Sequence, residues 1–335
     1  MTSRARAGLL VLLIAAAAAA AFLLGPSRLI AQRPVPDPPS YDAGPLAQAA
    51  RDHAIRALTE FDHGKVTKLR DGTSLREYVI EARHVEVEVA PGVRFPAWTF
   101  NGAIPGPSIR CTEGDSIRIT FTNKGSMPHS MHFHGIHRSN MDGVFEQIVP
   151  GGTFLYEFRA EPFGLHLYHC HTMPVKMHLM RGLYGVFLID PKTPRPPARE
   201  MVMVMNGFDT DLNGEDNEFY TVNGYANVFF RDHPIPVKQG ELQRLYLVNM
   251  TELDLVNSMH THATFFHVYP TGTSLTPSLY TDVITMGQAE RAILEFTYPY
   301  PGRYLFHAHQ NEFAELGWLG QFDVKSDEPR SANLP

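Results

Sequence analysis

The sequence repeats one series of local patterns, first in residues 97–189 and again in residues 219–324. Each copy begins with a Thr-x-Asn-Gly turn signal, at Thr99–Gly102 and at Thr221–Gly224, and continues with two alternating apolar and polar stretches around a glycine. Each copy then contains two histidine clusters and ends in a glycine-spaced apolar stretch. About seven or eight short strands per copy predict an all-β fold of two Greek-key β-sandwich domains.

The composition suits two domains of this kind and argues against other classes of protein. The chain has 335 residues, of which 44% are hydrophobic and 19% charged, with 26 glycines and 26 prolines, as expected of turn-rich domains with substantial cores. A net charge of −6 and the lack of a basic run beyond the N-terminus argue against a nucleic-acid partner. Cys111 and Cys170 lie in different local contexts, so we do not predict a disulfide.

The N-terminus has the features of an export signal. Two arginines in residues 1–6 precede an uncharged apolar run from Gly8 to Leu24, which predicts export to the periplasm or the extracellular space. This run is at the short limit for a membrane span, so a cleaved signal peptide and an uncleaved anchor both stay open. The predicted division of the chain is a signal peptide or anchor in 1–31, a linker or N-terminal extension in 32–75, a first domain in 76–195, a second domain in 196–327 and a tail in 328–335. Within the extension, the segment from about Gln32 to Ala50 is predicted to be a tether outside the fold.

The histidines carry most of the chemical information, because many of the 17 lie in short clusters. The first unit offers seven soft or borderline metal ligands: His129, His132, His134, His169, Cys170, His171 and His178. Alternate side chains of a strand share a face, so His169 and His171 are expected on one face and Cys170 on the other. One strand is thus predicted to join two metal sites.

These residues favour copper over other metals. Cys170 with His129 and His178 matches the trigonal site of electron-transfer copper, whereas zinc would want a fourth strong ligand. A single His-x-His pair is more often an ordinary part of a fold. Four pairs at matching points of a duplicated fold instead predict about three further copper ions with positions open to oxygen. The pairs are His132/His134, His169/His171, His260/His262 and His307/His309.

The remaining histidines lie outside the positions that match between the repeats. We interpret them as ordinary core or surface residues, and among them we expect His137 and His166 to be the ones that support the ligands. They are His53, His63, His84, His137, His166, His233 and His267.

From about Tyr78 to Val324 the chain resembles the two-domain multicopper oxidases, also called two-domain laccases. The motifs that carry the resemblance are PHSMHFHG, YHCHTMPVKMH, MHTHA and FHAHQ, and only the first unit has a cysteine between its paired histidines. The resemblance implies two cupredoxin-like domains, a homotrimer with a trinuclear cluster between chains, and coupling of one-electron substrate oxidation to reduction of dioxygen to water. It implies four copper ions per chain, with His129, Cys170 and His178 at type 1 copper, His132 and His260 at type 2 copper, and His134, His169, His171, His262, His307 and His309 at the type 3 pair.

Three further expectations depend on this resemblance. Asp142 matches an acidic position near the cluster and is the candidate for proton delivery, although an aspartate before Gly143 also suits a turn. Leu183 stands where relatives often have an axial methionine, which predicts a raised type 1 potential unless Met173, Met177 or Met180 substitutes for that methionine. The six methionines near the type 1 motifs are consistent with cuprous ion as a substrate, or with packing alone. They are Met127, Met131, Met141, Met173, Met177 and Met180.

Two other functions compete with an oxidase. A copper nitrite reductase shares the two-domain trimer and the blue copper site but has a mononuclear type 2 copper. That family has aspartate at the position of His132 and lacks a histidine at the position of His171. A copper-binding or electron-carrier protein needs only the type 1 site, so the eight further histidines argue against it. The sequence does not identify the electron donor.

Overall fold

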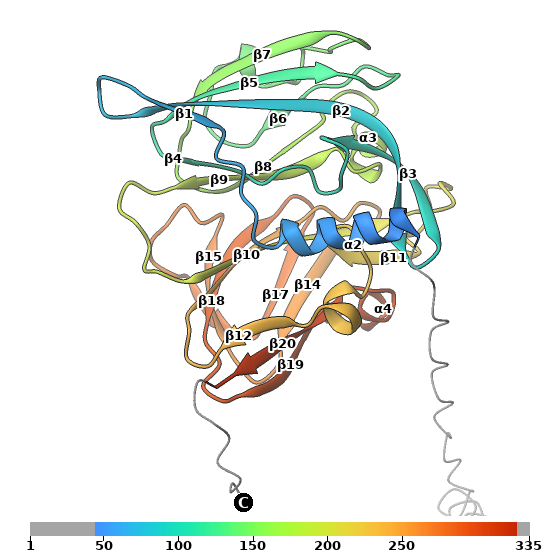
Figure 1. Ribbon diagram of the computed structural model, residues 1–335, viewed down its shortest axis with the longest axis vertical. Coiled ribbons are helices and arrows are strands. Elements are labelled where there is room, and N and C mark those ends of the chain that lie inside the picture. Colours follow the sequence, from blue (N-terminus) through green and yellow to red (C-terminus); the bar gives the residue numbers. More distant parts are fainter. Residues whose placement is uncertain (1–43, 327–335) are drawn as a thin grey trace, which may run out of the picture. The chain divides into compact units, whose positions relative to one another are not determined.

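The computed structural model describes residues 44–326, and the first part of this chain folds into two facing sheets (Figure 1). One sheet has the order β1-β2-β5-β7 with β3 also paired to β2, and the other has the order β4-β9-β8-β6. The first sheet contains β1 (Lys65–Lys68), β2 (Ser74–Ala90), β3 (Val93–Phe100), β5 (Ser116–Asn123) and β7 (Thr153–Arg159). The second contains β4 (Ile109–Thr112), β6 (His132–Phe133), β8 (Gly164–His169) and β9 (Tyr184–Asp190).

The second part of the described chain builds another pair of sheets. Their orders are β11-β10-β13-β18-β15-β16 and β12-β20-β19-β14-β17. The first of these contains β10 (Arg199–Phe208), β11 (Phe219–Val222), β13 (Gln243–Asn249), β15 (Phe266–Pro270), β16 (Leu279–Thr281) and β18 (Arg291–Phe296). The other contains β12 (Ile235–Lys238), β14 (Val256–Thr261), β17 (Val283–Gly287), β19 (Gly302–His307) and β20 (Leu319–Lys325). The predicted all-β class with two β-sandwiches is confirmed.

The repeated turn signals form the same turn in both sandwiches. Asn101 and Gly102 have φ values of 57° and 85°, and Asn223 and Gly224 have φ values of 55° and 88°. Asparagine and glycine are the residues that tolerate this left-handed conformation best. The sequence duplication therefore corresponds to a repeated backbone geometry.

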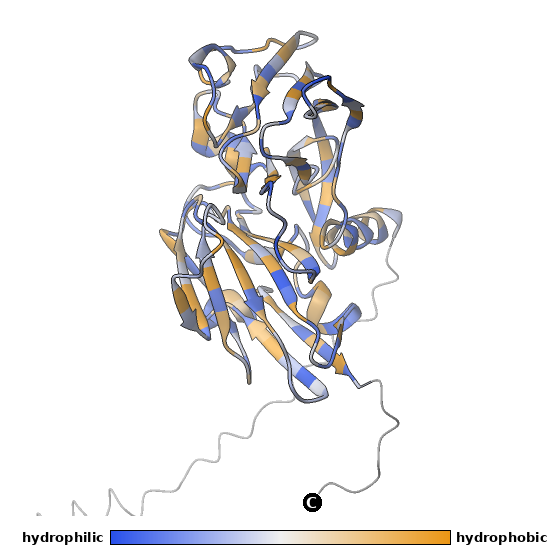
Figure 2. Ribbon diagram, turned by 90° about the vertical axis from the view of Figure 1, so that its left-hand side faces the viewer, coloured by the Kyte–Doolittle hydropathy of each residue, from blue (hydrophilic) through white to orange (hydrophobic). Residues whose placement is uncertain are grey.

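Apolar and polar residues alternate along many strands (Figure 2), and β9 is an exception because it is buried on both faces. In β9, Phe187 and Ile189 enter the core of the first sandwich. Val186 and Leu188, on the other face, enter a separate cluster that includes residues of β10 and β13 from the second sandwich. Burial on both faces explains why β9 reads as a continuous apolar run.

Helix α2 (Pro45–Ala57) departs from the sequence prediction, because its first turns lie in the tether that was expected to stay outside the fold. Its Ala54 and the following Leu58 belong to the core of the second sandwich, and the Val202 amide donates to the Leu58 carbonyl at 2.8 Å. The prediction that the tether up to Ala50 lies outside the fold is therefore wrong from Pro45 onward. The helix presents small alanines rather than a stripe of large apolar residues, so its pattern was not recognisable. The predicted signal segment 1–31 and the tail 328–335 lie outside the described residues.

The other helical segments are short and lie in loops between strands. They are η1 (Ser139–Met141), α3 (Val175–Met180), η2 (Val228–Asp232) and α4 (Asn311–Glu315). Among the described residues, no helix has both the length and the apolar character required to cross a bilayer.

Candidate metal centres

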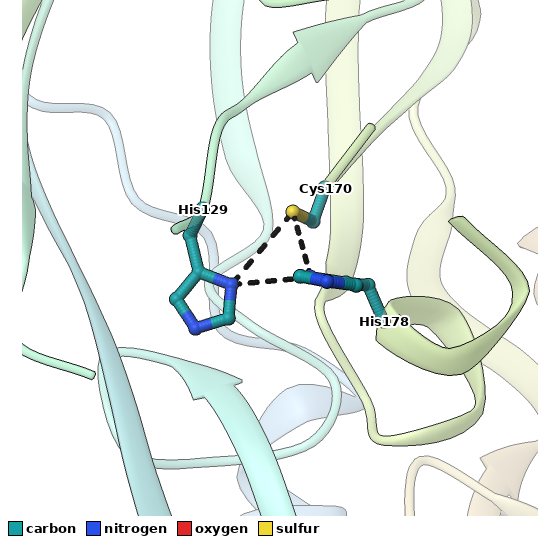
Figure 3. A group of neighbouring side chains, drawn as sticks. All are labelled: His129, Cys170 and His178. Atoms are coloured by element: carbon teal, nitrogen blue, oxygen red, sulfur yellow. Dashed lines mark hydrogen bonds between the residues drawn. The ribbon is translucent and has the colours of Figure 1, made fainter. Parts of the chain in front are cut away.

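Three candidate ligands from separate parts of the first sandwich meet in its core (Figure 3). His129 precedes β6, Cys170 directly follows β8, and His178 lies in α3; all three are fully buried. The Cys170 Sγ lies 3.2 Å from the His178 Nδ1 and 3.9 Å from the His129 Nδ1. The two Nδ1 atoms are 3.2 Å apart. A trigonal metal with bonds of about 2.0–2.3 Å requires ligand atoms about 3.6 Å apart, so these donors fit one.

The protonation of these groups also suits a metal. Burial lowers the pKa of His129 to about 3 and that of His178 to about 4, so both imidazoles are neutral and can donate a lone pair. Burial raises the pKa of the Cys170 thiol, an effect opposed by hydrogen bonds from Ser130 and Thr172. The Ser130 amide donates to the sulfur at 3.4 Å. A thiol in such a place becomes a thiolate when a metal binds it.

Leu183 is fixed beside this group by the backbone. The Cys170 amide donates to the Leu183 carbonyl at 3.0 Å, and the Leu183 amide donates to the His178 carbonyl at 3.2 Å. The Leu183 side chain is fully buried and belongs to the same core cluster as Cys170. Leu183, which the sequence places where relatives often have a methionine, therefore packs as an aliphatic side chain in the core beside Cys170.

A second group of histidines lies at the edge of the first sandwich, where β6 pairs with β8. His132 stands opposite His169 in the register of these strands, and the Nε2 atoms of His134 and His169 are 3.2 Å apart. His169 donates its Nδ1–H to the Cys170 carbonyl at 2.9 Å, which leaves its Nε2 lone pair free for a metal. The His171 ring lies 5.3 Å from that of His132.

The second sandwich holds an equivalent group where β14 pairs with β19. His260 stands opposite His307, and the Nε2 atoms of His262 and His307 are 3.1 Å apart. His307 donates its Nδ1–H to the Ala308 carbonyl at 2.7 Å, so its Nε2 is also free. The His309 ring lies 5.4 Å from that of His260. In the described chain, the histidines of the two sandwiches form separate groups rather than one.

Asp142 contacts the group in the first sandwich. The His132 Nδ1 lies 2.9 Å from the Asp142 carbonyl oxygen and 3.0 Å from its carboxylate Oδ1. The same carboxylate is 3.6 Å from the His137 Nε2, a nitrogen that also lies 2.8 Å from the Phe133 carbonyl oxygen. The other expected supporting residue, His166, places its Nε2 2.8 Å from the Pro162 carbonyl oxygen.

Asp282 is a site residue that the sequence reasoning missed. The His260 Nδ1 lies 2.9 Å from the Asp282 carbonyl oxygen and 3.7 Å from its carboxylate Oδ2. Asp282 therefore serves His260 as Asp142 serves His132. The signal that could have identified it is the aspartate in Thr-Asp-Val at 281–283, although it follows His260 by a longer interval than Asp142 follows His132.

His84 was expected to be an ordinary residue, and the structure differs. Its Nε2 lies 2.8 Å from the His129 Nε2, on the side of that ring away from Cys170. Burial lowers the pKa of His84, so its ring is neutral at pH 7. The contact joins β2 to a loop 45 residues further along the chain, a separation that no local pattern indicates.

Comparison with known proteins finds multicopper oxidases and copper-containing nitrite reductases. Two family models described as multicopper oxidase match residues 81–194 and 195–328. A crystal structure of a multicopper oxidase has a TM-score of 0.81 at 53% identity, covering 84% of this chain and 100% of that chain. The copper-containing nitrite reductase of Neisseria meningitidis is 29% identical over 305 residues, 85% of this chain and 76% of that protein. The copper nitrite reductase from Nitrosomonas europaea has a TM-score of 0.70 at 28% identity, covering 78% of this chain and 98% of that chain.

Proposed function

Because the chain is a two-domain member of the multicopper oxidase family, we propose that it oxidises a small reducing substrate one electron at a time and reduces dioxygen to water. Four electrons and four protons convert one dioxygen molecule into two waters. The observation that carries the proposal is the presence, in each sandwich, of four paired histidines beside one another. Eight imidazoles supply ligands for about three copper ions, whereas a mononuclear site would leave most of them unused.

Each histidine and the cysteine then has a role in the proposed reaction. We assign His129, Cys170 and His178 to type 1 copper, His132 and His260 to type 2 copper, and His134, His169, His171, His262, His307 and His309 to the type 3 pair. Copper at these positions supplies one-electron redox chemistry beside Cys170 and dioxygen binding beside the histidines. Cys170 follows His169 and precedes His171, so the covalent chain itself connects the two kinds of site.

Asp142 is the candidate for delivering protons to reduced dioxygen. Its carboxylate contacts the His132 ring and is partly exposed, so it can exchange protons with water. The imidazole tautomers assist it, because the Nδ1–H of His132 points to Asp142 and its Nε2 lone pair faces away from the aspartate.

The division of the histidines between two groups supports a homotrimer with shared sites. Neither sandwich alone holds all eight imidazoles, and within one chain the described groups stay separate. Exposed apolar residues accompany both, since Phe145 is 82% exposed near Asp142 and Leu255 is 83% exposed shortly before His260. We propose that copies of the chain bring one group from each sandwich together. Light scattering should give a mass about three times that of the 37.5 kDa chain.

The second candidate is a copper nitrite reductase, which the similarity to the Neisseria meningitidis enzyme favours. Copper analysis together with two acceptor assays separates the candidates. An oxidase should hold about four copper ions per chain and consume dioxygen with a phenolic donor or Cu(I), whereas a reductase should hold about two and reduce nitrite.

His171→Gln should lose dioxygen consumption but keep the blue absorption, and the control His267→Gln, at an exposed histidine, should change neither. Nitrite reduction without dioxygen consumption by the wild type would reject the oxidase.

We propose that the reducing substrate is either a phenol or cuprous ion. Met127 and Met173 are the exposed methionines near the type 1 residues, and thioethers bind cuprous ion well. If cuprous ion is a substrate, leucine at both positions should raise its KM and leave phenol oxidation unchanged. Equal effects on the two donors, or no effect on either, would mean that these methionines only pack against their neighbours.

We also propose that the protein is exported, because two arginines precede an apolar run before residue 25. Fractionation of cells that express the full chain tests this proposal.

A further inference from the structure

The buried type 1 residues are connected to the partly exposed surface by His84 and Trp98. These two residues face each other in the register of β2 and β3, and their rings stack at 4.8 Å with an 11° tilt. The His84 Nε2 contacts the His129 Nε2 at 2.8 Å, and its Nδ1 contacts the Ser126 Oγ at 3.1 Å. Both ring nitrogens of His84 therefore have partners, and its ring is held in one orientation.

Gly125 is the residue that permits this contact. A Cβ at position 125 would lie 2.7 Å from the His84 Nε2 and 2.9 Å from the His129 Nε2, closer than side chains tolerate. The Gly125 amide donates to the Asn123 Oδ1 at 2.9 Å, which holds this part of the backbone against the two rings. The lack of a side chain at Gly125 therefore lets the loop backbone pass close to the hydrogen-bonded rings of His84 and His129.

The orientation of His129 decides which imidazole donates the hydrogen bond between His84 and His129. His129 turns its Nδ1 towards Cys170 and His178, so when that nitrogen holds a metal the proton is on Nε2. His129 then donates to the His84 Nε2, and His84 donates its Nδ1–H to the Ser126 Oγ. An acceptor on the far nitrogen of a ligand imidazole makes the ligand a better electron donor, which stabilises cupric over cuprous copper.

The ligands themselves are out of reach of a donor in solution. His129 and His178 are fully buried, and within residues 44–326 the His178 Nε2 has no hydrogen-bond partner. Trp98 covers both rings edge to face, at 4.9 Å from His178 and 5.5 Å from His129. Trp98 and His84 are both only partly buried, so a donor can approach them from this side.

We propose that His84 is a positioning residue of the type 1 site, which orients His129, lowers the potential of the copper and, together with Trp98, forms the surface where the reducing substrate delivers its electrons. This inference rests on the proposed function for the presence of copper. In the step concerned, one substrate molecule loses one electron and one cupric ion becomes cuprous.

Two substitutions at position 84 test the proposal. His84→Phe keeps a ring against Trp98 but removes the acceptor, whereas His84→Gln keeps an acceptor. In a fixed redox buffer, the ratio of cuprous to cupric type 1 copper, read from the blue absorption, should rise about tenfold in His84→Phe and less in His84→Gln. The matched control is His267→Phe, at an exposed histidine of the second sandwich whose ring lies tilted against Tyr280 at 4.6 Å, and it should leave the ratio unchanged.

Donor kinetics provide the second readout. A raised potential alone would speed substrate oxidation, so a fall in kcat/KM of His84→Phe alongside the raised ratio indicates loss of the electron route rather than a weakened site. An unchanged ratio in His84→Phe overturns the proposal, as does an equal change in the control. If His84→Phe loses its copper, Ser126→Ala takes its place: a smaller rise supports the proposal and no rise overturns it. The redox titration needs no dioxygen, so a protein that binds type 1 copper but fails as an oxidase would still give a result.

Discussion

The two sandwiches hold their histidines in the same way, yet only the first builds a pocket for a thiolate-bound metal. His132 opposite His169 corresponds to His260 opposite His307. The backbone amide of the last histidine of each group is also held alike, since His171 donates to the Ser130 Oγ and His309 to the Ser258 Oγ, at 3.3 Å and 2.8 Å. The strand pairing and the serine contacts that hold the histidines, here called the backbone frame, are therefore present with or without a cysteine between the last two histidines.

The difference lies in the side chains behind this frame. Ala308 replaces Cys170, and Asn257 occupies the position three residues before His260, as His129 does before His132. The Ala308 amide donates to the Trp318 carbonyl at 3.1 Å and the Trp318 amide to the Phe313 carbonyl at 2.9 Å. These bonds repeat those that link Cys170, Leu183 and His178.

Trp318 and Phe313 thus stand in the second sandwich where Leu183 and His178 stand in the first. Trp318 is fully buried and Phe313 is 8% exposed, so an apolar core fills the second position. The comparison teaches that one backbone arrangement can form either a metal pocket or a packed core. Side-chain identity alone decides between them.

Changing Cys170 to alanine makes the first sandwich like the second and should have the largest effect. The thiolate is the source of the intense blue absorption, so Cys170→Ala should abolish that absorption and donor oxidation and lower the copper content by about one ion per chain. The matched control is Cys111→Ala, at the other buried cysteine, which should leave the absorption, the donor oxidation and the copper content unchanged. Persistent blue absorption in Cys170→Ala would contradict the assignment of this pocket.

Truncating Leu183 or Trp318 to alanine should lower the free energy of unfolding in either sandwich, but only the change at Leu183 should alter the blue absorption. Trp318→Ala removes a fully buried indole and should lower the free energy of unfolding by about 3–5 kcal/mol. Leu183→Ala should cost about 2–5 kcal/mol and also change the blue absorption. Denaturant unfolding of the copper-free variants and spectra of the copper-loaded ones measure the two effects. An equal spectral change in Trp318→Ala would mean that the second sandwich shares the metal pocket.

The paired aspartates allow the comparison to be tested within the proposed cluster. The Asp142 carboxylate lies 3.0 Å from its histidine and that of Asp282 lies 3.7 Å from its own. Asp142→Asn should slow dioxygen consumption about a hundredfold at saturating donor without changing the blue absorption, since proton transfer contributes effects of this size. Asp282→Asn should slow it less. The opposite order in stopped-flow reoxidation would transfer the proton-delivery role to Asp282.

Much of the fold and of the candidate site could be predicted from the sequence, because strand alternation translates directly into geometry. The repeated turn signals and His-x-His pairs predicted two sandwiches, and the alternation around Cys170 predicted a thiol directed away from its neighbouring imidazoles. The structure ends β8 at His169, so Cys170 and His171 lie just beyond the strand that was expected to carry them. Contacts between distant segments could not be predicted in this way. His84 meets His129 only because β2 and a later loop approach across Gly125, and helix α2 is recognisable only from the core that accepts its alanines.

The smallest expected effect concerns the position where the two sandwiches place Leu183 and Trp318. Leu183→Met keeps the volume of the side chain, so the free energy of unfolding of the copper-free protein should change by less than about 1.5 kcal/mol. The thioether can approach the pocket of His129, Cys170 and His178 as a weak axial ligand, which stabilises cupric copper and should lower the type 1 potential. Trp318→Met makes the same change in the second sandwich, where Ala308 provides no thiolate, and should leave the potential unaltered. Redox titration of the blue absorption measures both variants. A potential unchanged in Leu183→Met would show that the side chain at this position does not face the metal, so that the aliphatic residue fills the core in both sandwiches alike.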